Sequence, residues 1–282
     1  MSNLNKLIKT KTQTIICDIG ASPADPTPFI EDLINNTNCT LYGFEPNEEE
    51  FKKLKQTEKK KYFNYAIGSG KTETLNICSA PGMSSILEPN FEYLSLFHGF
   101  GEAARIVDKK KIQTKILDEI NFTQNIDFFK IDVQGYESEI INFGKNKLKE
   151  SLIIQIETSP FPLYKNEKTF SHICSQLEDL DFQLHMFNKI NTRCFKPTVV
   201  GNGIYSGMHH LFQLDCVFVK NINKINELNL EQLKKIALIL FYSFKSYDLV
   251  DLIIQKISKI ESIDYIGKYR EIIKNLKIDK FY

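Results

Sequence analysis

The sequence is poor in the features that mark secreted, metal-stapled or membrane proteins. Its six cysteines lie at positions 17, 39, 78, 174, 194 and 216, and no two of them form a Cys-x-x-Cys pair. This spacing indicates neither a zinc site nor a disulfide framework, and we expect no metal. No apolar run reaches the length of a transmembrane helix, and residues 1–6 lack the apolar core of a signal peptide. We therefore expect a cytoplasmic protein with reduced thiols and no transmembrane segment.

A strong excess of charge of either sign is also missing. The 36 Lys and Arg residues balance 35 Asp and Glu residues, which leaves a net charge of +1. This balance gives no electrostatic reason to expect nucleic acid or an anionic membrane as a partner. Hydrophobic residues make up 42% of the 282 residues, enough for a sizeable core in one large domain with an appendage or in two small domains.

Apolar strand-like runs alternate with helical segments along most of the chain. The pattern predicts strands at 14–17, 41–44, 62–67, 127–132, 152–157, 182–187 and 214–220, and helices at 29–35, 48–60, 137–143 and 170–180. Residues 72–77 could return as the hairpin partner of the third strand. Repeated strand–helix units predict an α/β fold with a parallel sheet, helices on both faces, and a ligand site beyond the carboxyl ends of the strands.

After residue 219 the composition changes. Residues 221–224 are polar and linker-like, and 229–277 carry the apolar stripes of two or three amphipathic helices. We predict a domain at 1–222 and a helical extension at 223–282. The extension could cap the sheet, form a homodimer face, or bind another partner.

The ends of the first two strands carry the residues of a cofactor site. Asp18 and Gly20 end the first strand, and Glu45 ends the second. Glycine allows the backbone to approach a ligand closely, and an acid at the second strand tip suits a ribose diol. The pattern lacks the Gly-x-Gly-x-x-Gly of a pyrophosphate loop, so a nucleoside cofactor without pyrophosphate, S-adenosylmethionine, fits it best.

Later strand ends supply candidates for catalysis. Asp132 ends the fourth strand, where the reacting group of a cofactor would lie. Glu157 ends the fifth strand, and the following aromatic segment with Tyr164 is suited to an acceptor pocket. His209 and His210 precede the last strand, and we predict that one of them is the base. Each of these residues has a structural alternative, as a strand end, an ion-pair partner or a core side chain.

Several segments resemble, in order and spacing, the motifs of the FkbM family of S-adenosylmethionine-dependent methyltransferases. These segments are Cys17-Asp18-Ile19-Gly20-Ala21-Ser22, Phe44-Glu45-Pro46-Asn47, Asn64-Tyr65-Ala66-Ile67-Gly68, Ser84-Ser85, Thr114-Lys115-Ile116-Leu117-Asp118 and Phe129-Lys130-Ile131-Asp132-Val133-Gln134-Gly135. The resemblance runs from about residue 15 to residue 219. It implies a class I Rossmann-like methyltransferase sheet, with cofactor contacts from Asp18, Gly20, Ala21, Glu45, Pro46, Ala66, Ile67, Ser85 and Asp132.

The resemblance also implies O-methylation of a hydroxyl group, on a sugar, a capsule-type surface polysaccharide or a secondary metabolite. Two positions depart from the family pattern. Pro23-Ala24-Asp25-Pro26 replaces the usual second glycine of the first loop, and Gln134 stands where an acid is usual. The second departure weakens any metal site or base that would rest on that acid.

Two other functions remain open at this stage. A nicotinamide-dependent oxidoreductase shares the strand, the glycine and the strand-tip acid, although the pyrophosphate loop is missing. A non-catalytic, methyltransferase-like scaffold would explain the altered first loop and the helical tail.

Overall fold

The computed structural model describes residues 4–23, 27–201 and 203–276. The chain forms two compact units. The larger unit comprises Ile15–Pro26 and Leu41–Ile222, and the smaller comprises Met1–Thr14, Thr27–Thr40 and Asn223–Tyr282. The segments 1–14 and 27–40 thus group with the C-terminal residues.

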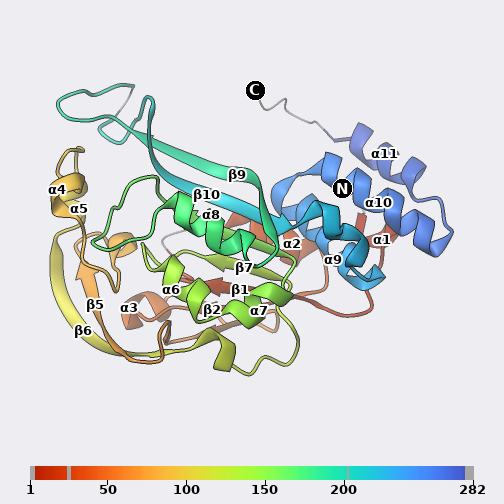
Figure 1. The fold of residues 1–282 in the computed structure, drawn as a ribbon, viewed down its shortest axis with the longest axis horizontal. Coiled ribbons are helices and arrows are strands. Elements are labelled where there is room, and N and C mark those ends of the chain that lie inside the picture. The colour runs from red at the N-terminus through yellow and green to blue at the C-terminus, as the bar shows by residue number, and fades with distance from the viewer. Residues whose placement is uncertain (1–3, 24–26, 202, 277–282) are drawn as a thin grey trace. The chain divides into compact units, whose positions relative to one another are not determined.

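A seven-stranded sheet in the order β3-β2-β1-β7-β8-β10-β9 forms the centre of the fold (Figure 1). Its strands are β1 (Thr14–Ile19), β2 (Cys39–Phe44), β3 (Lys60–Phe63), β7 (Phe128–Ile131), β8 (Ile153–Thr158), β9 (Phe182–Arg193) and β10 (His210–Lys220). The β1–β7, β7–β8 and β2–β3 pairs are parallel. The expected α/β class is therefore confirmed.

Two strands depart from the all-parallel sheet that the sequence predicted. β10 runs antiparallel to β8, and β9 runs antiparallel to β10. Antiparallel strands can be joined without a crossover helix, whereas parallel strands need one. The helical sequence pattern that marks a parallel pair is therefore missing between β9 and β10. Both strands are also longer than predicted, since β9 continues to Arg193 and β10 already begins at His210.

The central strands are buried along their whole length. Every residue of β1, β2 and β7 is buried, which explains why their sequences are continuous apolar runs without alternation. The helices α6 (Glu137–Asn142), α7 (Lys145–Glu150) and α8 (Phe170–Glu178) lie in front of this sheet in Figure 1. Ile140, Leu148 and Ile173 are among their fully buried side chains in the hydrophobic core. The predicted helices at 137–143 and 170–180 are thus confirmed.

A second, three-stranded sheet has the order β4-β6-β5. It contains β4 (Ala66–Ile67), β5 (Thr72–Cys78) and β6 (Ile106–Lys115). The single strand predicted at 62–67 is wrong, because β3 and β4 belong to different sheets. The pairing expected for 72–77 is also wrong, since β5 pairs antiparallel with β6 and not with the third strand. β6 was not predicted, because its residues 107–111 are all exposed and show no apolar alternation.

The predicted helix at 48–60 is much shorter in the structure. α3 spans only Glu48–Phe51, and the chain then turns at Thr57 to enter β3. Gln56 holds this turn, because its side chain accepts from the backbone N–H of Tyr62 and donates to the Tyr62 carbonyl, each at 2.9 Å. A segment with only Phe51 and Leu54 as apolar anchors buries too little surface to sustain a longer helix.

Short helices complete the larger unit. These are the 3-10 turns η1 (Pro81–Met83) and η2 (Leu117–Glu119) and the helices α4 (Phe91–Leu94) and α5 (Phe100–Ala103). They join β5 to β6 and β6 to β7, and η1 lies beside the cavity described below.

The smaller unit is helical and contains both ends of the described chain. Its elements are α1 (Leu4–Leu7), α2 (Pro28–Asn36), η3 (Ile222–Glu227), α9 (Leu230–Ile239), the π-helical turn η4 (Leu240–Phe244), α10 (Tyr247–Glu261) and α11 (Ile266–Lys274). The tail is helical, as predicted, and α2 begins at Pro28, where a proline costs no backbone hydrogen bond.

Contacts within this unit join the tail to the N-terminal segments. The ring of Phe29 stacks on Phe244 with centroids 5.9 Å apart. Lys245 lies 2.6 Å from the carboxylate of Asp32, and Glu231 accepts from the backbone N–H of Lys11 at 2.8 Å. No helix in the described part of the chain is long and apolar enough to cross a membrane.

Candidate functional site

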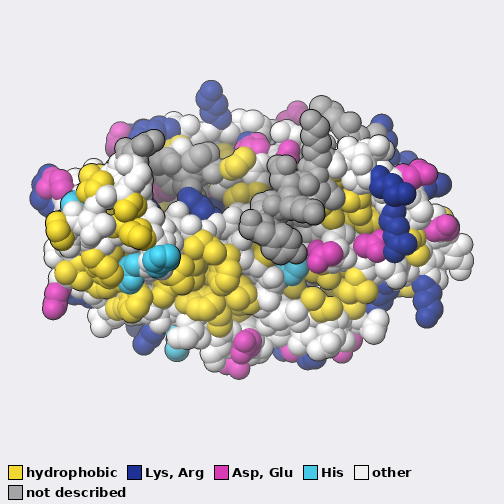
Figure 2. Space-filling model, turned by 90° about the horizontal axis from the view of Figure 1, so that it is seen from above, with side chains coloured by type: hydrophobic (Ala, Val, Ile, Leu, Met, Phe, Trp, Pro, Cys, Tyr) yellow, Lys and Arg dark blue, Asp and Glu magenta, His cyan; other side chains and the backbone are white. Residues whose placement is uncertain are grey.

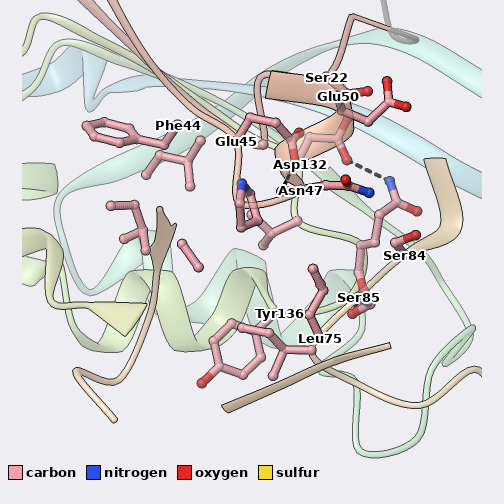
Figure 3. A pocket seen from close by; sticks show the side chains of 18 of the residues that line it. Ser22, Phe44, Glu45, Asn47, Glu50, Leu75, Ser84, Ser85, Asp132 and Tyr136 are labelled. Carbon is pink, nitrogen blue, oxygen red and sulfur yellow. Dashed lines mark hydrogen bonds between the residues drawn. The ribbon is translucent and has the colours of Figure 1, made fainter. Parts of the chain in front are cut away.

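A cavity with an empty volume of about 920 Å³ opens at the carboxyl ends of β1, β2 and β7. This volume includes space that is open to solvent at the cavity mouth. In Figure 3 the polar side chains of Glu45, Asn47 and Asp132 lie together on one side, and Leu75 and Tyr136 lie on the other. One ligand could thus meet an acidic, polar region and an apolar wall.

Most of the residues predicted to bind the cofactor line this cavity. They are Gly20, Glu45, Pro46, Ala66, Ile67, Ser85 and Asp132. Asp18 and Ala21 are absent from the described lining. Ala21 is buried, with its N–H donated to the Phe44 carbonyl at 3.0 Å, and Asp18 faces Lys130.

Gly20 is required here for a reason other than the one expected from the sequence. Its φ is +88°, in the left-handed region that favours glycine. A Cβ at this position would lie 1.8 Å from the carbonyl oxygen of Asp132. The glycine therefore lets the ends of β1 and β7 pack against each other, and a Cβ would first collide with the backbone of Asp132.

Glu45 is a buried acid at the end of β2. Its side chain lines the cavity although the residue is only 7% exposed, and Oε1 accepts from the backbone N–H of Asn47 at 2.7 Å. Burial raises its pKa to about 7, with the nearby Glu50 adding to this shift and the Asn47 N–H opposing it. Such a carboxylate can accept hydrogen bonds from a ligand that supplies hydroxyl groups.

A buried lysine lies between two acids at the ends of β1 and β7. Lys130 Nζ is 3.3 Å from Asp132 Oδ2 and 3.6 Å from Asp18 Oδ1, and only 5% of the lysine side chain is exposed. The single positive charge of the lysine offsets part of the negative charge of these two acids. Asp132 lines the cavity, whereas Asp18 contacts the lysine and is not among the described lining residues.

Gln134 joins the cavity to the predicted acceptor residues. Its Nε2 donates to Asp132 Oδ1 at 2.7 Å and to Glu157 Oε2 at 2.9 Å, and its Oε1 accepts from the Tyr164 hydroxyl at 3.0 Å. Figure 3 draws the bond to Asp132 as a dashed line. Glu157 and Tyr164 are therefore one hydrogen bond away from the lining. Burial, followed by the charge of Asp132, holds the pKa of Glu157 well above its usual range.

The segment between β5 and α4 forms another wall. Asn76, which is 2% exposed, donates through Nδ2 to the carbonyls of Ser85, Ile86 and Leu87, each at 3.2 Å. Ser85 in turn donates its hydroxyl to the Gln134 carbonyl at 2.6 Å. A single buried amide thus fixes this wall of the cavity.

The predicted histidines lie elsewhere. Neither His209 nor His210 is among the described residues that line the cavity. His209 is exposed, and His210 begins β10 inside an aromatic cluster made of Tyr93, Phe97, Phe161, Phe195 and His210. Its Nε2 lies 2.7 Å from the Tyr93 hydroxyl, and burial lowers its pKa.

The aromatic cluster is partly open to solvent. Phe161 is 45% exposed and Phe195 is 43% exposed. Figure 2 shows hydrophobic side chains, with histidine beside them, gathered toward the end at which Figure 1 places α4, α5 and the β9–β10 connection. Phe97 of the aromatic cluster and Tyr164 belong to one hydrophobic core cluster. The aromatic cluster therefore shares a core with the tyrosine that donates to Gln134.

Sequence reasoning missed part of the lining. The residues not predicted as site residues include Ser22, Asn47, Glu50, Tyr65, Leu75, Ser84, Gln134 and Tyr136. Asn47, Tyr65 and Ser84 stand beside predicted residues in the motifs and could have been found there. Leu75 could not, because the strand that carries it was paired incorrectly. The described residues include no group of three His, Cys, Asp or Glu arranged to hold a metal.

The sheet order and a cavity at the strand ends define an α/β protein of the class I methyltransferase type. The family model "Methyltransferase FkbM domain" matches residues 18–184, more than half of the chain. The chain therefore belongs to the FkbM family of methyltransferases, as the motifs indicated.

Solved structures give more distant similarities. An FkbM methyltransferase from Methylobacillus flagellatus KT is 11% identical, with a TM-score of 0.41 over 73% of this chain and 43% of that one. Magnesium protoporphyrin IX methyltransferase from Synechocystis PCC 6803, solved with bound SAM, is 10% identical, with a TM-score of 0.36 over 77% and 72% of the two chains. The comparison with curated proteins gives no match.

Proposed function

We propose that this protein transfers a methyl group from S-adenosylmethionine to a hydroxyl group of its acceptor. The main support is the buried carboxyl of Glu45, which lines a cavity at the strand ends of a chain in a methyltransferase family. A ribose diol offers the hydroxyl donors that such a buried acceptor needs. Family membership and the missing pyrophosphate loop both favour this cofactor over a nicotinamide dinucleotide.

The lining suits the three parts of such a cofactor. Glu45 would accept from the ribose hydroxyls, and Pro46, Ala66 and Ile67 would provide apolar surface for the adenine. Gly20 and Asp132, which also line the cavity, would contact the methionine portion. When bound, S-adenosylmethionine supplies a methyl group on a positively charged sulfur, already activated for transfer. The chain then has to align the acceptor, exclude water and receive a proton.

We propose that Asp132 receives the proton that the acceptor hydroxyl loses. Its carboxylate lines the cavity, and Lys130 and Gln134 fix both of its oxygens. The histidine pair remains a second candidate for this role, with His210 as the better placed member, because it contacts Phe161 in the segment that follows β8. General bases of either kind typically contribute about 10²–10⁴ in rate.

For the acceptor, we propose a hydroxyl of a sugar, a surface glycan or a secondary metabolite. The resemblance to the FkbM family supports this proposal, and so do the exposed rings of Phe161 and Phe195, which could pack against an acceptor. We also propose that the protein works in the cytoplasm, where its six free cysteines stay reduced.

We keep dimerisation through the C-terminal helices as a proposal, supported by the exposed Leu252, Ile260 and Ile263. Sedimentation of the full chain as a monomer at high concentration would contradict it.

The test is a methyl-transfer assay with S-adenosylmethionine and polysaccharide or metabolite fractions from the producing cell. Mass spectrometry should find products heavier by one methyl group, attached at oxygen. Asp132→Asn should lower the rate by about 10²–10⁴. If Asp132→Asn retains the full rate while His210→Ala loses it, the histidine is the base. Methyl transfer to nitrogen or carbon would contradict the hydroxyl acceptor.

A further inference from the structure

Two acids from neighbouring parallel strands, Asp132 and Glu157, lie close together beside the cavity. Ile131 of β7 pairs with Ile156 of β8, so Asp132 and Glu157 are the next residues along these two strands. Their carboxylates both lie within hydrogen-bond distance of one nitrogen, Gln134 Nε2. Two carboxyl groups that share one site disfavour each other's charged form unless something bridges them, and the charge of Asp132 accordingly adds to the burial that raises the pKa of Glu157.

Divalent cations commonly bridge such a pair, because they prefer carboxylate oxygens at about 2.0–2.6 Å. In this protein the bridging position is filled by an amide. The two N–H groups of Gln134 Nε2 suffice for one bond to each acid, at 2.7 Å to Asp132 and 2.9 Å to Glu157. The opposite orientation of the amide would set its oxygen against two carboxylate oxygens and lose the bond from Tyr164.

The amide is held firmly in this position. Gln134 has a φ of +56°, which is unfavourable for a residue with a Cβ. Its carbonyl accepts from Ser85 Oγ at 2.6 Å, and its side-chain oxygen accepts from the Tyr164 hydroxyl at 3.0 Å. Strained backbone that several contacts hold in place is typical of functional positions.

We propose that Gln134 is a positioning residue whose amide replaces a divalent cation between Asp132 and Glu157, so that the carboxylate pair is held at the cavity without a metal. One oxygen of Asp132 is thereby fixed by Gln134 and the other by Lys130. The proposal rests on the proposed function only in taking this cavity as the place of methyl transfer. Its test uses neither cofactor nor acceptor, so the two can fail separately.

The experiment adds Mn²⁺ alone to the full chain and follows both the melting temperature and the electron paramagnetic resonance signal of free Mn²⁺. Wild type should bind no Mn²⁺ at this site and show no shift in melting temperature. Gln134→Glu places a third carboxylate beside the pair, and millimolar Mn²⁺ should raise its melting temperature by about 5 °C. Gln134→Ala removes the amide and should show a smaller rise, about 2 °C.

Gln213→Ala is the matched control. Gln213 Nε2 also donates to Glu157 Oε2, at 3.0 Å, but it does not contact Asp132 in any hydrogen bond of the described residues. This variant loses one bond to Glu157 Oε2 and keeps both bonds from Gln134 Nε2. Mn²⁺ should therefore not change its melting temperature. An equal response from Gln213→Ala would overturn the bridging role.

Two further results would also overturn the proposal. In the first, wild type binds Mn²⁺ and loses this binding in Asp132→Asn, which would make the pair a metal site. In the second, both Gln134 variants fold, but neither binds Mn²⁺ nor shows a shift in melting temperature. If neither Gln134 variant folds, the wild-type resonance measurement still decides, because Asp132-dependent Mn²⁺ binding contradicts the proposal and its absence supports it.

Discussion

The buried carboxyl of Glu45 lowers the stability of the ligand-free protein at neutral and alkaline pH. Burial raises its pKa from an ordinary 4.5 to about 7. A carboxyl whose pKa is higher in the folded state favours folding fully below its ordinary pKa, and this contribution is lost as the pH rises through the folded value. The ligand-free protein is therefore less stable at pH 8 than it would be with a neutral side chain at this position.

Glu45→Gln should accordingly raise the free energy of unfolding by about 2–3 kcal/mol at pH 8 and change it little at pH 4. Urea denaturation at the two pH values measures the difference. Glu49→Gln is the control, because the Glu49 side chain is 73% exposed and should change stability by less than about 0.5 kcal/mol at either pH. A Glu45→Gln protein that is less stable than wild type at pH 8 would contradict the account.

Single residues at strand ends were the best predicted part of the site. Glu45, Gly20 and Asp132 could be located because the carboxyl ends of parallel strands meet at one edge of a sheet. The reason for Gly20 could not be predicted, since it depends on the carbonyl of Asp132, more than 100 residues away. Gln134 was noticed only as a departure from a pattern, and two of its side-chain hydrogen-bond partners, Glu157 and Tyr164, come from later segments of the chain.

At the scale of elements, the wall of the cavity between β5 and α4 depends on one buried side chain, that of Asn76. Asn76 is the only described residue whose side-chain amide bonds to three successive carbonyls of the 85–87 segment. Loss of this amide takes a donor from the part-buried carbonyls of Ile86 and Leu87, which costs about 1–3 kcal/mol, whereas the Ser85 carbonyl keeps the backbone N–H of Asn76 at 2.8 Å.

Asn76→Ala should therefore lower the free energy of unfolding by about 1–3 kcal/mol and weaken S-adenosylhomocysteine binding. Thermal denaturation and calorimetry measure the two effects. Thr74→Ala, on the same strand, loses only a surface bond to Lys111 and should stay within about 0.5 kcal/mol of wild type. Equal losses in both variants would show that the strand, and not the amide, supports the wall.

The elements of the main sheet were predictable because burial on both faces produces continuous apolar runs. The second sheet was predicted only in part, because residues 72–77 were found as a strand but their partner β6 is mostly exposed. β6 is exposed at residues 107–111, and its lysines gave no periodic signal. The antiparallel β9 and β10 were found as strands, but their direction depends on a tertiary pairing that a local pattern does not record.

For the molecule as a whole, the helical tail and the N-terminal segments belong to one compact unit, and every residue that lines the cavity belongs to the other. The sequence indicated the change of character near residue 223. It gave no sign that residues 1–14 and 27–40 would group with the tail, because the packing of Phe29 on Phe244 joins positions over 200 residues apart.

Damage to the smaller unit should therefore affect stability more than ligand binding. Phe244 is 5% exposed, and Phe244→Ala should lower the free energy of unfolding by about 3–5 kcal/mol. At a temperature where the variant is folded, its affinity for S-adenosylhomocysteine should stay within about twofold of wild type, because Phe244 and the cavity belong to different compact units and sites without shared partners are usually independent. Lys259→Ala, at an exposed position of α10, is the control and should be nearly neutral. A large loss of affinity in folded Phe244→Ala would contradict this independence.

The central claim is that the cavity binds S-adenosylmethionine through Glu45, and titration calorimetry with S-adenosylhomocysteine tests it most directly. Wild type should bind this ligand at one site and should not bind NADH. Folded Glu45→Ala should lose about 1.5–3 kcal/mol of binding free energy, because a hydrogen bond to a charged group is lost. Full affinity in Glu45→Ala, or binding of NADH in place of S-adenosylhomocysteine, would contradict the claim.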